Sequence, residues 1–242
     1  METIKICIIE TGRTKQELIN KHGDFPHMIE EWLRPVLNNA QFITVRASEG
    51  EPVKNAAQKF DAFIITGSPH GVYENLPWMS KLKTELQEIA KEKKPIFGIC
   101  FGHQILAESF GGKVEKSTKG WGIGVDSYMF YKEGKGQGIN QLMPVYVYHQ
   151  DQIVELPPKA QVLGGSSHCE YGIVQYDFPC LSVQFHPEFT SNFVSDLINT
   201  SEDQKENKEK LLNIVKEASV DNFIFAQWVR DFIKKNINKK AT

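Results

Sequence analysis

The sequence lacks the long apolar runs and the strong net charge that mark membrane and nucleic-acid-binding proteins. No run approaches the ~20 apolar residues needed to cross a bilayer, and the start "METIKICIIETG" has no signal-peptide pattern. The formal net charge is only -2, from 28 Lys and Arg against 30 Asp and Glu. We therefore expect a cytoplasmic protein with neither nucleic acid nor membrane as a partner.

Cysteine is also scarce, with four residues in a chain of 242, too few for a disulfide framework at this length. Cys7 and Cys180 lie in apolar strand-like runs, where cysteine usually acts as a small hydrophobe. Phosphate-binding loops are missing, because neither GxxxxGK[ST] nor GxGxxG follows a strand. Cys100 and His103 have metal-ligand spacing, but no second pair accompanies them. We expect no metal and no cofactor.

The sequence does contain a clear alternation of strands and helices. Strand-length apolar runs occur at 4–10, 41–47, 60–67 and 95–100, with helical spacing between them. This predicts a single-domain α/β fold, a three-layer α/β/α sandwich with a central, mostly parallel, flavodoxin-like sheet. Shorter strands after residue 113 are expected to join the same sheet. The core should span about 4–200, followed by a helical extension over about 201–238. We expect the apolar stripe of its last helix to pack on the chain's own sheet, and a docking helix for a synthetase is the alternative. The stripe consists of Phe223, Phe225, Trp228, Val229, Phe232 and Ile233.

One strand runs into a helix through a cysteine that is flanked by two glycines. In "KPIFGICFGHQILA", Gly98 and Gly102 stand two positions either side of Cys100, with a helix predicted over 104–110. This is the G-x-C-x-G form of a nucleophile elbow, and a helix N-terminus favours the thiolate. The backbone N–H of Phe101 would then point at an oxyanion. A buried cysteine with glycines that serve packing alone is the alternative.

A nucleophile needs a base, and His186 is the best placed of the seven histidines. It follows the strand "CLSVQF" and precedes Pro187, which ends that strand at the edge where such sheets place their sites. Glu188 is close enough to accept from the second ring nitrogen, which completes a nucleophile–base–orienter chain with Cys100. The alternative is a strand terminator with a solvated glutamate. Five other histidines lie in turns or polar stretches, point away from the thiol or adjoin another cysteine: His22, His27, His70, His103 and His168.

A third element is "FIITGSPHGVYE", in which a strand ends in a loop rich in glycine and proline. Gly67 can bring a second backbone N–H to the oxyanion, because an oxyanion hole takes one donor from the residue after the nucleophile and one from another strand's loop. An ordinary β–α connection is the alternative.

The blocks "TGSPHGVYE", "GICFGHQILA" and "QFHPEF" together resemble the class I, triad-type glutamine amidotransferase family over about residues 4–200. The resemblance implies a thiol amidase that opens the γ-amide of glutamine, or a γ-glutamyl bond, through a glutamyl thioester. It implies Cys100 as nucleophile, His186 as base and Glu188 as orienting acid, with Gly67 and Phe101 as oxyanion donors.

The resemblance also implies roles beside the triad. Gln104 matches the glutamine that helps to bind substrate. The stretch "YHQDQI" matches the family's loop next to the active site, which makes His149 and Asp151 structural or substrate-facing.

No ATP-binding domain follows the amidase part, so we expect a stand-alone member, similar to the amidase domain of guanylate synthetase and to γ-glutamyl peptidases. It should act alone on a small glutamine or γ-glutamyl compound, as a monomer or homodimer. An ammonia-supplying subunit of a separate synthetase is one alternative. A non-catalytic regulatory protein and a redox protein on the same fold are others, disfavoured by the intact triad and by the His-Pro-Glu relay.

Overall fold

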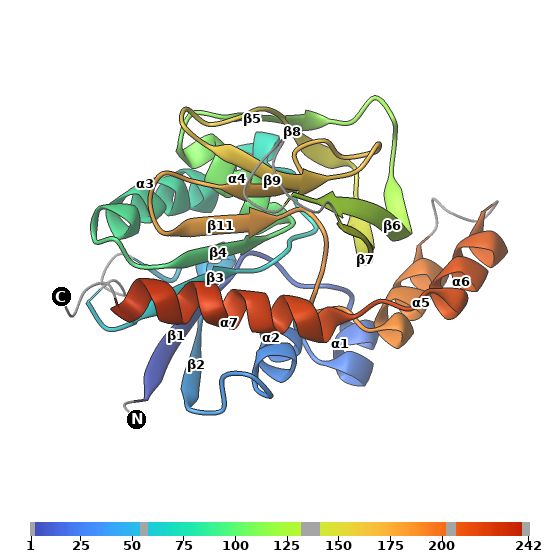
Figure 1. The fold of residues 1–242 in the computed structure, drawn as a ribbon, viewed down its shortest axis with the longest axis horizontal. Helices are drawn as coiled ribbons and strands as arrows, with labels where there is room; N and C mark the ends of the chain where they lie inside the picture. Colours follow the sequence, from blue (N-terminus) through green and yellow to red (C-terminus); the bar gives the residue numbers. More distant parts are fainter. Residues whose placement is uncertain (1–2, 54–57, 132–140, 202–206, 239–242) are drawn as a thin grey trace.

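The computed structural model describes residues 3–53, 58–131, 141–201 and 207–238, and over these ranges the centre of the fold is a nine-stranded sheet (Figure 1). In sheet order the strands are β2 (Ala40–Arg46), β1 (Ile4–Glu10), β3 (Ala62–Ile65), β4 (Ile96–Ile99), β11 (Cys180–Val183), β10 (Ile173–Gln175), β9 (Gln161–Gly165), β6 (Gly122–Phe130) and β7 (Gln141–His149). Neighbours are parallel from β2 to β11 and antiparallel from β11 to β7. The predicted α/β class is confirmed.

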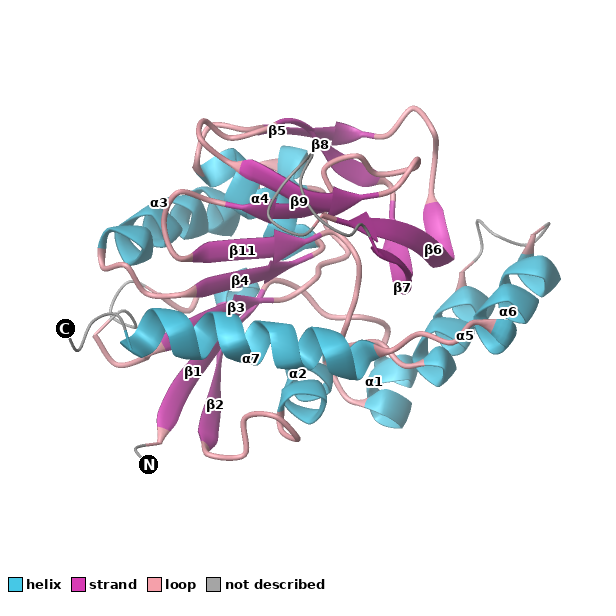
Figure 2. Cartoon of the chain, viewed as in Figure 1, coloured by secondary structure: helices cyan, strands magenta, loops and turns pink. Residues whose placement is uncertain are grey.

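The central parallel strands β1, β3, β4 and β11 are largely apolar because both of their faces are covered. Along β1, Cys7 and Ile9 belong to one core cluster, whereas Ile6 and Ile8 belong to another on the opposite face. Helices α3 (Pro77–Lys91) and α4 (Phe101–Ser109) contribute to the first cluster, and α2 (Phe25–Leu33) and α7 (Asn222–Asn238) to the second (Figure 2). The result is the three-layer sandwich that the sequence predicts.

Two of the later strands leave the main sheet, so the expectation that all of them join it is wrong. Strands β5 (Lys113–Lys116) and β8 (Asp151–Glu155) form a separate antiparallel pair. Their buried residues Val114 and Ile153 pack into the cluster beneath α4. The pair therefore acts as a cover over the elbow helix.

The described residues also form three further helices and two 3₁₀ turns. They are α1 (Gln16–His22), α5 (Ser191–Thr200) and α6 (Lys208–Glu217), with 3₁₀ turns η1 (Ala47–Glu49) and η3 (Val72–Glu74). None of the helices in the described ranges is both long and apolar enough to span a membrane.

The last helix, α7, packs on the protein's own sheet, and lies across the parallel strands as the red helix of Figure 1. Phe225, Val229 and Ile233 are buried in the core, and the Trp32 indole N–H donates to the Asn222 carbonyl at 2.8 Å. The predicted internal packing of the apolar stripe is confirmed for these residues. Phe223 differs, because it is 51% exposed at the start of the helix.

Candidate active site

The turn at Cys100 has the geometry of the predicted elbow, and Cys100 itself takes the strained backbone conformation. Cys100 has φ 52° and ψ -102°, a positive φ that is rare for a residue with a side chain. A Cβ on Gly98 would lie 2.6 Å from Leu106 Cδ1, and one on Gly102 would lie 2.6 Å from the Ile65 carbonyl oxygen. Both glycines are needed because neighbouring atoms lie too close for a Cβ. The helix begins at Phe101, three residues before the predicted start.

The predicted base and its carboxylate meet in a buried ion pair beside the thiol. His186 Nδ1 lies 2.8 Å from Glu188 Oε1, and the imidazole lies beside the Cys100 side chain, which also acts on its pKa. The ring stacks flat on Phe189, with centroids 3.9 Å apart and an interplanar angle of 6°. Cys100, His186 and Glu188 are only 6, 3 and 4% exposed. The three predicted residues therefore form one connected chain.

The charge state of this chain follows from its burial and its neighbours. Burial alone lowers the pKa of His186, but the negative charges of Glu188 and Cys100 and their hydrogen bonds outweigh it and raise that pKa to about 10. The imidazole is thus protonated at neutral pH. By contrast, burial raises the pKa of Cys7 and of Cys169 to about 12, so these thiols stay protonated.

Gly67 lies next to the side chains of both Cys100 and His186. A Cβ on this residue would lie 3.0 Å from His186 Cε1 and 3.8 Å from Cys100 Cβ. In the residues that the structure describes, the backbone N–H groups of Gly67 and Phe101 have no hydrogen-bond partner. Both are therefore available to a ligand at the thiol, although Gly67 comes from the loop after β3 and Phe101 from α4.

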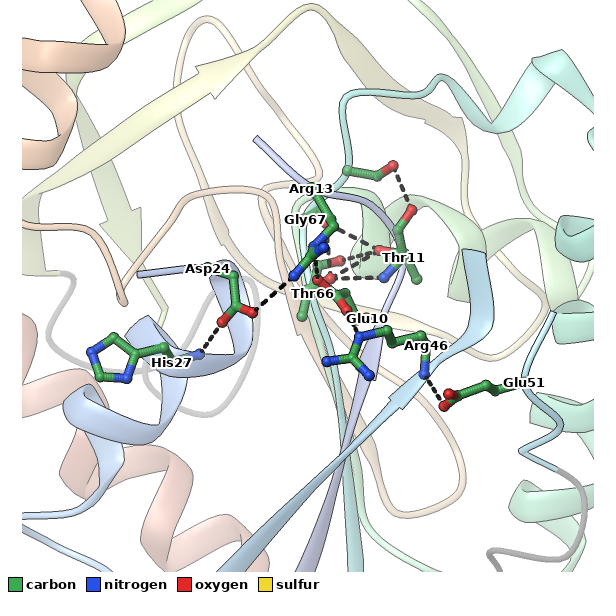
Figure 3. A network of polar contacts seen from close by, with 10 residues as sticks. Glu10, Thr11, Arg13, Asp24, His27, Arg46, Glu51, Thr66 and Gly67 are labelled. Carbon is green, nitrogen blue, oxygen red and sulfur yellow. Dashed lines mark hydrogen bonds and ion pairs between the residues drawn. The ribbon is translucent and has the colours of Figure 1, made fainter. Parts of the chain in front are cut away.

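A buried polar network holds the Gly67 loop in place (Figure 3). The Thr11 backbone N–H donates to Thr66 Oγ1 at 3.0 Å, and the Thr11 hydroxyl lies 3.0 Å from the carbonyl oxygens of both Thr66 and Gly67. At the edge of the same strand, buried Glu10 is paired with Arg13 at 3.3 Å and Arg46 at 3.2 Å. The ends of β1 and β3 are thereby locked together.

One residue of the site, Gln184, was missed by sequence reasoning. Its side-chain Nε2 lies 3.5 Å from Cys100 Sγ, and its Oε1 accepts from Gln104 Nε2 at 3.2 Å. Gln104 also donates to the Asp151 carbonyl at 2.9 Å. A polar residue in the apolar run that leads to His186, two positions earlier and so on the same side of the chain, was the available signal.

The other expected residues lie around a polar cavity of about 270 Å³ that reaches Cys100. Its lining includes Gln104, His149 and Asp151, together with the charged side chains of Glu74 and Lys116. Burial lowers the pKa of His149 to about 3, so the ring is neutral, and its Nδ1 lies 3.3 Å from the Asp151 carbonyl oxygen. Burial also raises the pKa of the Asp151 carboxyl.

His103 is not part of the group formed by Cys100, His186 and Glu188. It is fully buried and its Nδ1 is 2.8 Å from Ser182 Oγ, away from the thiol as the sequence predicts. Nowhere in the described ranges do three His, Cys, Asp or Glu side chains gather as a metal ion would require.

A buried cysteine at an elbow, joined to a histidine–carboxylate pair, defines a class of thiol-dependent active site, and comparison with known proteins identifies the family. The model of the class-I glutamine amidotransferase family matches residues 17–197. The chain belongs to this family.

Relatives and solved structures agree. Gamma-glutamyl peptidase 3 of Arabidopsis thaliana is 28% identical over 206 residues, which cover 80% of this chain and 83% of the relative. A glutamine-hydrolyzing GMP synthase subunit of Methanothermobacter thermautotrophicus is 28% identical over 173 residues, covering 71% and 87%. The crystal structure of a glutamine amidotransferase from Thermotoga maritima superposes with a TM-score of 0.75 at 21% identity, over 98% of this chain and 99% of the other, and shows the shared fold.

Proposed function

We propose that the protein is a cysteine-dependent amidohydrolase that cleaves the γ-amide of glutamine or a γ-glutamyl bond and releases glutamate with ammonia or an amine. The observation that carries the proposal is the chain from Cys100 through His186 to Glu188, with its 2.8 Å buried ion pair. Such a chain supplies a nucleophile, a proton carrier and the group that orients it.

The chemistry takes two steps. The Cys100 thiolate attacks the γ-carbonyl carbon, and the N–H groups of Gly67 and Phe101 stabilise the oxyanion that forms. His186 gives its proton to the leaving nitrogen, the C–N bond breaks, and a glutamyl thioester remains on Cys100. Water then attacks the thioester while His186 takes a proton from it, and the thiolate is expelled as glutamate forms.

The polar cavity supports the recognition of a glutamyl group. A free glutamyl group carries an ammonium and a carboxylate on its α-carbon, and the cavity offers Glu74 and Asp151 to the first and Lys116 to the second. Gln104 and His149 hold the Asp151 backbone from two sides. The glutamyl end of the substrate would enter here with its γ-carbonyl at Cys100.

The alternative is a glutaminase subunit that supplies ammonia to a separate synthetase. Similarity to the GMP synthase subunit favours this version, and similarity to γ-glutamyl peptidases favours an independent hydrolase. We propose the independent hydrolase, as a monomer or homodimer, because the nucleophile, base and carboxylate are already joined in the chain by itself.

The test is release of glutamate by the purified chain from glutamine and from simple γ-glutamyl amides, without any partner. We expect steady turnover that Cys100→Ser abolishes while the melting temperature is retained. Turnover that survives Cys100→Ser would refute the assignment of the nucleophile. Activity on glutamine that appears only when a synthetase is added would favour the version with a synthetase partner.

A further inference from the structure

A second cavity reaches the nucleophile, and its character differs from that of the polar cavity. It has a volume of about 100 Å³ and is lined by Cys100 and His186 together. Most of its remaining wall is apolar, from Phe25, Pro69, Tyr148, Phe189 and Leu197; the two other lining residues are Thr14 and Ser68, and the Ser68 hydroxyl already donates to the Thr11 carbonyl at 2.7 Å. The polar cavity contains Cys100 in its lining but not His186.

The position of His186 decides which part of a substrate enters which cavity. His186 must pass a proton to the nitrogen that leaves, so that nitrogen has to lie against the imidazole. The glutamyl side of the scissile bond then extends into the polar cavity, where Glu74, Lys116 and Asp151 lie. Any substituent on the leaving nitrogen extends into the apolar cavity beside His186.

We propose that this apolar cavity is a leaving-group subsite, and that the substrates are γ-glutamyl amides of amines with a short apolar chain. The inference rests on the proposed function and names its substrate class. The cavity is smaller than the ~150 Å³ that hold a benzene ring, so a chain of three or four carbons suits it better than an aromatic ring. Apart from the reacting pair Cys100 and His186, no charged side chain is part of its lining among the described residues, which disfavours a charged group close to the nitrogen.

The cavity is built from rigid parts that are distant in sequence. Phe25 begins α2, Phe189 follows the His-Pro-Glu segment, and Leu197 lies on α5. The rings of Phe25 and Phe189 stack with centroids 6.2 Å apart, and Phe189 also packs on Phe193 at 4.5 Å. A wall of interlocked rings is shaped before substrate arrives, so selectivity follows from its size and polarity.

The test is a series of leaving groups on the unaltered protein. We would measure kcat/KM for glutamine and for the γ-glutamyl amides of methylamine, propylamine, butylamine and 3-hydroxypropylamine. We expect kcat/KM to rise roughly fourfold per added methylene up to butyl. The hydroxypropyl amide has the length of the butyl amide but a polar end, and should fall about tenfold below it because the hydroxyl finds an apolar wall.

A matched pair of variants locates the effect. Leu197→Asn places a polar group of similar size in the cavity wall, and should bring the ratio of butyl to hydroxypropyl turnover close to one. Leu142→Asn makes the same change at a leucine that is 60% exposed on β7, and should keep the wild-type ratio. An unchanged ratio in Leu197→Asn would overturn the placement of the leaving group.

The series of leaving groups on the wild-type protein tests the inference even if a variant fails to fold. Turnover that is highest for glutamine and falls with chain length would overturn this inference but leave the proposed amidohydrolase standing, with the cavity as an exit for ammonia. Absence of turnover with every compound would overturn both.

Discussion

Adding one methyl group at Gly67 should damage catalysis far more than stability. The new Cβ of Gly67→Ala would lie 3.0 Å from His186 Cε1, whereas ordinary contacts of this kind are 3.4–4 Å, so its neighbours must move by at least about 0.4 Å. The imidazole has little freedom to move, because Glu188 holds its Nδ1 at 2.8 Å and Phe189 stacks against its face at 3.9 Å. The Gly67 loop or the imidazole must therefore leave its position.

Either movement reduces the rate. If the loop retreats, the Gly67 N–H no longer reaches the oxyanion, and losing one such donor lowers kcat by about 10²–10³-fold. If the ring shifts by a fraction of an ångström, the proton transfer loses alignment, and a 1 Å error can lower the rate by about 10²-fold. We expect kcat to fall about 10²-fold, and overpacking by one methyl to lower the free energy of unfolding by about 1–2 kcal/mol.

The assay pairs glutamate release with thermal unfolding of the same samples. Gly50→Ala is the control, because it adds the same methyl in open space but at φ +87°, which costs about 1–2 kcal/mol of stability without contact with the site. We expect this control to lose stability and keep its kcat. A folded Gly67→Ala protein with kcat within about threefold of wild type would refute the reasoning, since the contact would then be absorbed without effect on the reaction.

Three further predictions concern the nucleophile, the carboxylate and the last helix. A diazo-ketone analogue of glutamine should label Cys100 alone in mass spectrometry, and Cys100→Ser should lower kcat about 10³-fold or more; labelling elsewhere would contradict the assignment. The raised pKa of His186, about 10, means that its proton is held below that pH and lost above it, so activity should fall as pH rises through about 10. Glu188→Gln removes the carboxylate that raises this pKa, so the alkaline limb of the pH–rate profile should move toward neutral pH; an unmoved limb would speak against the pair. Val229→Ala, at a fully buried site on α7, should lower the free energy of unfolding by about 2 kcal/mol, whereas Ile224→Ala, at a residue 39% exposed, should change it little.

Local signals predicted which side chains the structure brings together at the elbow. The glycines around Cys100 and the proline after His186 interrupt regular structure, and each interruption has a physical reason that is visible in a short stretch of sequence. The apolar runs of the parallel strands are equally local, because burial on both faces leaves few polar positions. The catalytic roles of Cys100, His186 and Glu188, and the oxyanion role of Gly67 and Phe101, stay predictions until the variants are measured.

Other features depend on contacts between segments that are distant in the sequence, and the sequence alone does not show such contacts. Strands β5 and β8 look like members of the main sheet because pairing partners are not encoded in a strand's own residues. The apolar cavity needs Phe25 and Leu197 to meet, although most of the sheet and the whole elbow lie between them in sequence. In the sequence, Gln184 only interrupts an apolar run. The structure places its side-chain Nε2 3.5 Å from Cys100 Sγ.

The site owes its geometry to the order of three neighbouring strands. Strands β3, β4 and β11 lie side by side and parallel, with Gly98 level with both Ile65 and Ser182. Because parallel strands end at one edge, β3 leads to the loop of the proposed oxyanion donor Gly67, β4 to the proposed nucleophile and β11 to the proposed base. The central turn is bonded to both neighbours, since the Cys100 N–H donates to the Val183 carbonyl at 2.8 Å and the Gly102 N–H donates to the Thr66 carbonyl at 3.2 Å. These two bonds hold the strained cysteine at a fixed distance from each partner, so the backbone of the sheet edge sets the alignment on which the proposed reaction depends.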